Sequence, residues 1–153
     1  MRFCLCAIVV LAACGKGDKA PAADTTATAV APPAPAPIAL ADVAGKWTLK
    51  TTVEGKDTTV TAALVATATT DGWTMTNPKQ KPTPMRIRTD ADSIMADAGP
   101  FPSVLMKGAM VTTNSVFHLQ DGKLVGTMVA RYTGAKVGAD SVLRGRQEAT
   151  RMP

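Results

Sequence analysis

GKWTLKTTV, residues 45–53, is the stretch of this chain that decides its fold. Trp47, Leu49, Thr51 and Val53 alternate in it with lysine and threonine. Successive side chains of a β-strand point to opposite faces, so this segment has one face suited to a core and one suited to water. It therefore predicts an amphipathic strand at the beginning of a folded domain.

The same two-residue period continues to the end of the chain, interrupted by short runs rich in glycine, proline, asparagine and aspartate. Asp71-Gly72 and Asp121-Gly122 are pairs typical of tight hairpins, because glycine accepts a positive φ. We expect further strands over residues 58–69, 73–76, 85–89, 93–96, 103–106, 109–120, 123–132 and 141–150. The sequence therefore predicts an all-β domain, an antiparallel meander of eight or nine strands that closes into a barrel and leaves no exposed edge.

Two segments with glycine depart from the regular pattern. Gly99-Pro100-Phe101-Pro102 has two prolines, which do not fit a central strand, so we expect a stiff loop with Phe101 at its tip. Gly126 lies inside an expected strand, where it would permit a bulge or the tight curvature of a barrel. Residues 122–126 have neither the glycine spacing nor the following helix of a phosphate-binding loop.

Leu11-Ala12-Ala13-Cys14 resembles the lipobox of bacterial lipoproteins. Arg2 and an apolar run over residues 3–11 precede it, in the order typical of a secretory signal. The resemblance implies that residues 1–13 are a signal peptide and that Cys14 becomes the lipidated first residue of the mature protein. The alternative, a transmembrane helix, needs about 20 apolar residues, and this run is shorter. Because Gly15 rather than aspartate follows the cysteine, the resemblance implies an envelope protein anchored in the outer membrane and facing the periplasm.

Residues 14–40 are an expected tether, rich in alanine, threonine and proline and with nothing large to bury. Residues 41–153 are the expected barrel domain, which contains no cysteine and so has neither a disulfide nor a Cys-type metal site. Fourteen basic and ten acidic residues give this domain a net charge of +4. The basic residues are scattered, without interleaved aromatic residues, which argues against nucleic-acid binding.

Gly45-Lys46-Trp47 resembles the Gly-x-Trp signature of lipocalins and the wider calycin group. The resemblance implies an up-and-down barrel in which Trp47 plugs the closed end and an arginine of the last strand packs across its ring. Arg151 is the candidate, because it shares a strand face with Leu143, and Arg144 is the alternative. The second lipocalin motif and the usual helix before the last strand are absent. The domain is also similar to small lipocalin-like bacterial lipoproteins of unassigned function.

The chain offers little for catalysis or metal binding. His118 is the only histidine, and it lies on the strand face expected to meet water. Asp90 and Asp92 flank a turn, where aspartate caps backbone groups, and they supply too few oxygen ligands for calcium. The methionines lack the clustering of a copper(I) site and are interpreted as core residues. We therefore expect no enzyme, no cofactor and no metal.

These expectations leave two candidate functions. The first is a monomeric, membrane-anchored barrel that binds a small apolar ligand, with its mouth opposite Trp47 and Phe101 as a lid. Contacts with such a ligand are expected at Leu64, Met85, Ile87, Phe101 and Met128. The second is a structural or protein-interaction lipoprotein with a packed barrel core and no ligand. A hydrolase or isomerase on a calycin scaffold is disfavoured by the single histidine.

Overall fold

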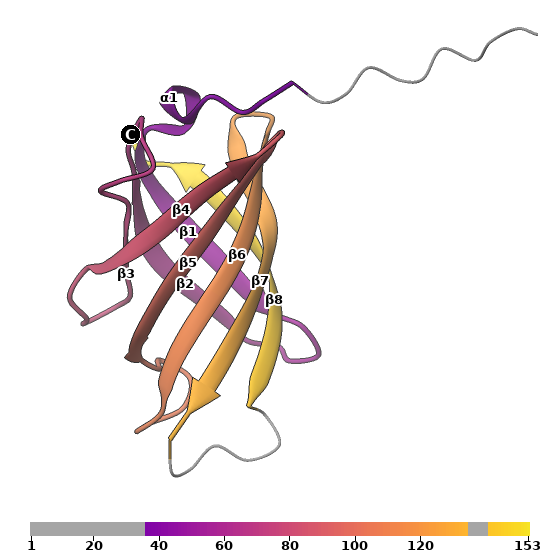
Figure 1. Ribbon diagram of the computed structural model, residues 1–153. Helices are drawn as coiled ribbons and strands as arrows, with labels where there is room; N and C mark the ends of the chain where they lie inside the picture. Colours follow the sequence, from indigo (N-terminus) through magenta and orange to yellow (C-terminus); the bar gives the residue numbers. More distant parts are fainter. Residues whose placement is uncertain (1–35, 135–140) are drawn as a thin grey trace, which may run out of the picture. The chain divides into compact units, whose positions relative to one another are not determined.

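Eight antiparallel strands follow one another along the chain and close into a barrel in the computed structural model of this protein (Figure 1). The structure describes residues 36–134 and 141–153, which belong to one compact unit, Ala34–Pro153. The expected signal peptide, Cys14 and most of the expected tether lie outside the described residues. The elements are α1 (Leu40–Val43), β1 (Gly45–Val53), β2 (Thr59–Ala66), β3 (Thr74–Thr76), β4 (Thr83–Asp90), β5 (Ser93–Pro102), β6 (Met110–Gln120), β7 (Lys123–Thr133) and β8 (Val142–Arg151).

Each strand pairs with its neighbours in sequence, and β1 pairs with both β2 and β8, which completes the barrel. Trp47 of β1 lies opposite Leu64 on β2 and Arg151 on β8. The prediction of an all-β antiparallel meander that closes into a barrel is confirmed, with eight strands. Closure gives every strand two partners, which removes the open edges that promote association between sheets.

β5 continues through the segment that was expected to be a loop. Gly99-Pro100-Phe101-Pro102 forms the end of this strand, and Phe101 is buried opposite Val111 of β6. The expectation of an aromatic-tipped loop was wrong because the register between β5 and β6 shifts between Ala98 and Phe101. Pro100 occupies this irregularity, where a missing N–H costs no ladder hydrogen bond, and regular pairing resumes at Phe101.

Residues 103–109 connect β5 and β6 as a folded loop, so the strand expected over residues 103–106 was also wrong. The Ser103 hydroxyl accepts hydrogen bonds from the backbone N–H groups of Leu105 (3.0 Å) and Met106 (2.8 Å). The backbone N–H of Ser103 donates to the carbonyl of Ala109 (2.9 Å). A serine that satisfies nearby backbone groups in this way competes with an extended chain, and here it folds the segment back.

The hairpin between β2 and β3 is wider than the Asp71-Gly72 pair predicts. β2 ends at Ala66, before the end of the expected strand over residues 58–69. The hydroxyl of Thr67 donates to the carbonyl oxygens of Thr69 and Asp71, which holds the chain in a longer turn. The Asp121-Gly122 turn between β6 and β7 does form with only these two residues, both at positive φ.

Apolar side chains fill the interior of the barrel, as the alternation on β1, β6, β7 and β8 requires. The largest fully buried side chains are Trp47, Trp73, Phe117, Leu49, Leu64, Ile94, Leu124 and Val43. Gly126 pairs with Phe117 without a shift of register, and a Cβ at Gly126 would collide with the carbonyl oxygen of Val116. Glycine therefore permits a close approach of β6 and β7 here rather than a bulge.

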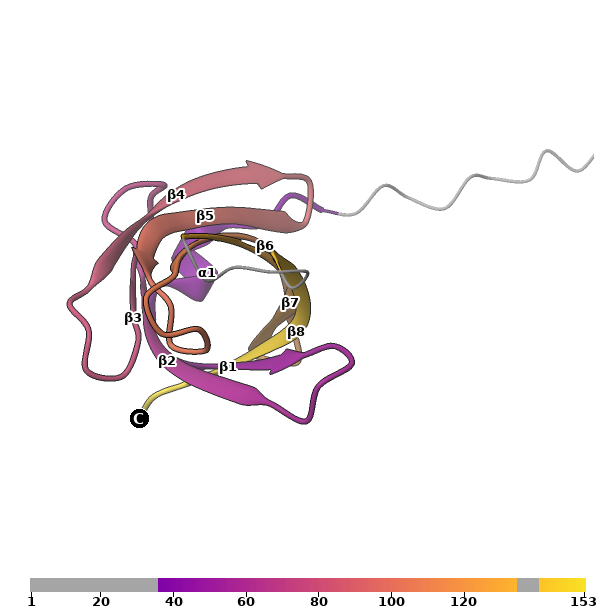
Figure 2. The ribbon, with the colours of Figure 1, turned by 90° about the horizontal axis from the view of Figure 1, so that it is seen from below.

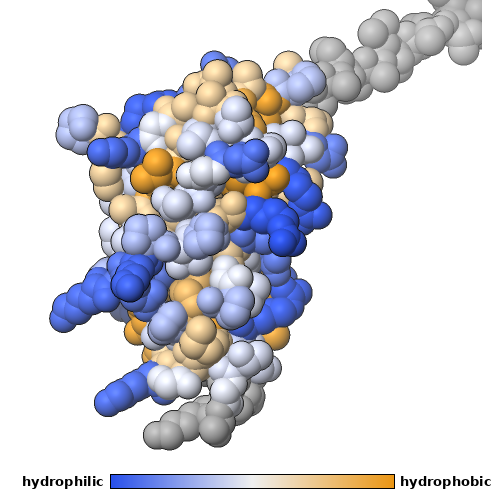
Figure 3. All heavy atoms as spheres, turned by 60° about the vertical axis from the view of Figure 1, so that its left-hand side comes forward, coloured by the Kyte–Doolittle hydropathy of each residue, from blue (hydrophilic) through white to orange (hydrophobic). Residues whose placement is uncertain are grey.

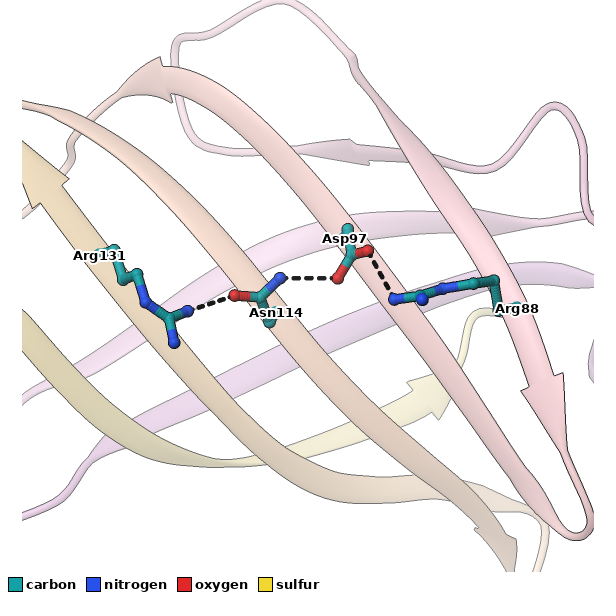
Figure 4. Close-up of polar contacts among 4 residues, drawn as sticks. All are labelled: Arg88, Asp97, Asn114 and Arg131. Carbon is teal, nitrogen blue, oxygen red and sulfur yellow. Dashed lines mark hydrogen bonds and ion pairs between the residues drawn. The ribbon is translucent and has the colours of Figure 1, made fainter.

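The outer face of the barrel is largely polar, with small apolar areas between charged residues on the face in Figure 3. Arg88 of β4 donates to the Asp97 carboxylate of β5 (3.0 Å), and Asn114 of β6 donates to the same carboxylate (2.7 Å). Arg131 of β7 donates in turn to the side-chain oxygen of Asn114 (Figure 4). These hydrogen bonds, made by one residue from each of four consecutive strands, join the outer faces of β4, β5, β6 and β7. In the described part of the chain, no helix has the length and apolar character to cross a membrane.

Candidate functional site

Trp47 lies near the beginning of β1, at the end of the barrel where α1 is found (Figure 1). Its ring is fully buried, and its Nε1–H donates to the carbonyl of Val43 (2.9 Å), which fixes α1 to the ring. The guanidinium carbon of Arg151 lies 4.4 Å from the ring centroid, within the range of a cation–π contact. Arg151 also donates to the carbonyls of Ala44 (2.6 Å) and Asp42 (2.8 Å). One arginine thus joins β8, the tryptophan and the backbone at the end of α1.

Gly45 has a specific part in this closed end. Its φ is +143°, a conformation that favours glycine, and a Cβ there would lie 2.7 Å from Nη1 of Arg151. Of the two candidate arginines, the structure places Arg151 over the tryptophan, whereas Arg144 is exposed on the outer face of β8. The glycine therefore leaves the space that the guanidinium occupies.

A pocket of about 60 Å³ lies in the part of the barrel farther from Trp47. Side chains from β1, β2, β3, β5, β6, β7 and β8 contribute to its wall, together with the beginning of the 103–109 loop. The apolar lining residues include Leu49, Val53, Ala62, Met75, Val111 and Ala130. A concave, mainly apolar site of this kind inside a small barrel is suited to a small ligand.

The structure divides the five residues expected to contact a ligand into two groups. Phe101 and Met128 line the pocket, Phe101 from the wall of β5 rather than from a lid. Leu64, Met85 and Ile87 are buried in the core but lie outside the pocket lining. Alternation alone identifies inward-facing positions, and it does not distinguish the height of each position along the barrel.

The 103–109 loop covers the end of the pocket. Figure 2 views the barrel from the end opposite α1, and the connection between β5 and β6 folds inward across that end. Val104 and Leu105 of this loop contribute to the lining, yet they are 43% and 37% exposed. These two side chains therefore stand between the pocket and water, the position that the sequence assigned to Phe101.

Polar side chains at inward positions give the pocket its hydrogen-bonding groups. Gln147 of β8 is 7% exposed, and its Nε2–H donates to Oγ1 of Thr51 on β1 (3.1 Å). Oε1 of Gln147 is buried and has no hydrogen-bond partner in the part of the chain that the structure describes. Thr113 and Tyr132 also line the pocket and are buried. Burial raises the pKa of Tyr132 above its ordinary value of 10.0, while a hydrogen bond with Ser103 acts in the opposite direction.

Gln147 was not predicted from the sequence, and Thr51 was expected only as one position on the core-facing side of its strand. The sequence did contain a signal for both residues, because each lies on the same face of its strand as apolar, inward-facing neighbours. A polar residue at such a position is unusual in a packed core and needs a partner. What the sequence does not contain is the register that places Gln147 directly opposite Thr51.

His118 lies on the exposed face, near Asp92 and Ser93. Its Nδ1 is 3.5 Å from a carboxylate oxygen of Asp92 and 3.5 Å from Oγ of Ser93. A nucleophile–base–acid relay needs the serine and the aspartate on different ring nitrogens, whereas here both approach the same one. The cluster therefore lacks the geometry of a catalytic triad. No group of three or more histidine, cysteine or acidic side chains within residues 36–134 and 141–153 is arranged to hold a metal ion.

Comparisons with protein-family models, with curated proteins and with solved structures found no match for this chain.

Proposed function

We propose that this chain is a membrane-anchored envelope lipoprotein, lipocalin-like in its barrel, that binds a small apolar ligand and is not an enzyme. The observation that carries the proposal is the apolar-lined pocket in the part of the barrel farther from Trp47. Its wall is built from seven of the eight strands, so the site is held by the whole barrel rather than by one flexible segment.

The size of the pocket restricts the ligand. Sites for drug-sized molecules have volumes of roughly 300–1,000 Å³, and an engineered cavity of about 150 Å³ binds benzene. A pocket of about 60 Å³ admits a short alkyl chain or a similar slender group. Larger apolar molecules such as retinoids would require displacement of the 103–109 loop. We therefore propose a small neutral molecule, or one short chain of a larger one, as the occupant.

Methionine methyl groups provide a direct test of binding. Met75 and Met128 line the pocket, whereas Met95 and Met152 do not. Residues 14–153 with Cys14→Ser, labelled with ¹³C at the methionine methyls, would be titrated with methyl pentyl ether and with 1-hexanol. We expect saturable shifts of the Met75 and Met128 signals and little change at Met95 and Met152. Absence of any saturable shift would contradict the proposed ligand binding.

The anchoring part of the proposal rests on the lipobox-like Leu11-Ala12-Ala13-Cys14. A single acyl chain binds membranes weakly, whereas several chains on one cysteine attach a protein durably. Cys14→Ser removes the acceptor of the lipid, so the protein should leave the membrane fraction after washing with salt and carbonate. Cys6→Ser, within the proposed signal peptide, is the matched control and should leave fractionation unchanged. Retention of the Cys14→Ser protein in washed membranes would contradict the proposal.

The second candidate function is binding of a partner protein by a barrel without ligand. It is favoured by the exposure of Val104 and Leu105 at the covered end of the pocket. The same titration distinguishes the two candidates, because a barrel that serves only a partner gives no saturable methyl shifts with small apolar molecules.

A further inference from the structure

Gln147 lines the pocket and carries the one buried side-chain oxygen or nitrogen of the described residues that has no hydrogen-bond partner. Oε1 is buried and without a partner, while the other end of the amide is held by Thr51 at 3.1 Å. An unpaired buried acceptor costs free energy, and native proteins rarely keep one without a function or a bound molecule. Because Gln147 lines the pocket, a hydrogen-bond donor bound beside its amide would remove this cost.

The strand register places Gln147 below the mouth of the pocket rather than at its rim. Gly145 pairs with Val53 at the end of β1, and Gln147 pairs with Thr51, the next inward position. Two residues along a strand correspond to about 7 Å. Gly145 lacks a side chain, and a Cβ there would lie 3.2 Å from Thr51 and 3.5 Å from Met128. The nearest atom to such a Cβ would be the backbone carbonyl oxygen of Thr52, at 2.9 Å, so glycine permits the close approach of β8 and β1 here.

The charge of the lining restricts the chemistry of the donor. Among residues 36–134 and 141–153, none that lines the pocket is basic or acidic. A carboxylate headgroup would be buried without a positive partner, which is costly, and it could not donate to Oε1. An ammonium group would likewise be buried without a carboxylate. A neutral hydroxyl donates to Oε1, and because it also accepts, it satisfies the amide group whichever of its two ends faces the pocket.

We propose, building on the proposed ligand binding, that the pocket selects neutral ligands with a hydroxyl group and that Gln147 is the residue that determines this preference. The hydroxyl binds Gln147 beside Thr51, and the alkyl part extends toward Phe101 and the 103–109 loop. The ligand class is a small aliphatic alcohol or the hydroxyl-bearing end of a short chain.

Two isomeric probes test the proposal. 1-Hexanol and methyl pentyl ether have the same composition, but only the alcohol donates a hydrogen bond. With the methionine-labelled protein, residues 14–153 with Cys14→Ser, we expect 1-hexanol to bind about tenfold more tightly than the ether, the effect of one hydrogen bond to a buried acceptor. Hexanoate at pH 7 should bind more weakly than either.

Gln147→Met removes the amide with little change of volume, and the preference for the alcohol should fall to about one while the ether still binds. Glu148→Gln is the matched control, because Glu148 follows on the same strand but points outward and pairs with Lys123. Its preference should equal that of the unmodified barrel. If Gln147→Met does not fold, the comparison of the two probes in the parent protein still tests the preference for a hydroxyl group, and Gln147→Leu tests its assignment to this residue.

The outcomes separate the inference from the proposed function. Saturable binding of both isomers with equal affinity in the parent protein would overturn the selection by Gln147 and leave ligand binding standing. A preference for the alcohol that persists in Gln147→Met would overturn the assignment to this residue. Binding of neither probe would overturn both.

Discussion

At the scale of the residue, the closed end of the barrel depends on a few specific contacts. Trp47 is fully buried and donates to Val43, and Arg151 packs across its ring at 4.4 Å. The guanidinium also donates to two backbone carbonyls next to α1. A buried aromatic ring contributes mainly through apolar area, whereas the stacked arginine contributes less because it remains in contact with water.

Truncation of these two residues should therefore have unequal effects. We expect Trp47→Ala to lower the free energy of unfolding by about 3–5 kcal/mol, the range for a buried aromatic residue. Arg151→Met should lower it by about 0.5–2 kcal/mol through the lost cation–π contact. Arg144→Met, on the exposed face of the same strand, is the control and should change it little. Urea unfolding measures all three, and a loss below about 1 kcal/mol for Trp47→Ala would contradict the role of the ring.

Tyr132 is the only tyrosine of the chain, so its ionisation can be followed by absorbance near 295 nm without interference from other tyrosines. Burial raises its pKa above 10.0. Above pH 10 the unfolded chain loses this proton while the folded barrel keeps it, so stability should fall as the pH rises from 10 through the pKa of the folded state. Ser103→Ala removes the hydrogen bond that lowers the pKa and should raise it further. A Tyr132 titration at or below pH 10 would contradict this account.

At the scale of the element, alternation and turn residues predicted most of the strands, because each inward position needs an apolar side chain. The failures occurred where another local interaction was stronger than the pattern. The proline at position 100 was accommodated by a shift of register, and Ser103 folded the following segment through its own hydroxyl. The register shift is not visible without the partner strand, since it is a property of two strands.

The contact between β6 and β7 at Gly126 gives a prediction at this scale. A Cβ at this position would collide with the backbone carbonyl of Val116, which cannot rotate away as a side chain can. We expect Gly126→Ala to lower the free energy of unfolding by about 1–3 kcal/mol, the usual range for forced overpacking. Thr127→Ala, the next residue and outward-facing, is the matched control. Equal stability of the two variants in urea unfolding would indicate that the strands can separate without cost.

At the scale of the whole molecule, closure was predictable but the pocket was not. The number and order of the strands follow from the turns, and a sequential meander of this size closes to remove its edges. The pocket depends on which inward-facing residues lie at the same level along the barrel axis. Phe101 and Met128 do so, whereas Leu64, Met85 and Ile87 do not. The level of each residue along the barrel follows from the pairing register of the strands. The residue pattern of a single strand does not contain that register.

Closure also makes the stability of the barrel depend on its last strand. β8 pairs with both β1 and β7, so its removal opens two long ladders at once and exposes the core. We expect deletion of residues 142–153 to abolish the cooperative unfolding transition, seen by both near-ultraviolet and far-ultraviolet circular dichroism. Deletion of residues 14–33, which lie outside the compact unit, is the control and should leave the transition in place. Because all three cysteines precede residue 36, the transition of residues 14–153 with Cys14→Ser should also be insensitive to reductant. A cooperative transition that survives the loss of β8 would mean that the remaining strands form a stable open sheet, and the barrel would then not need its closing pair.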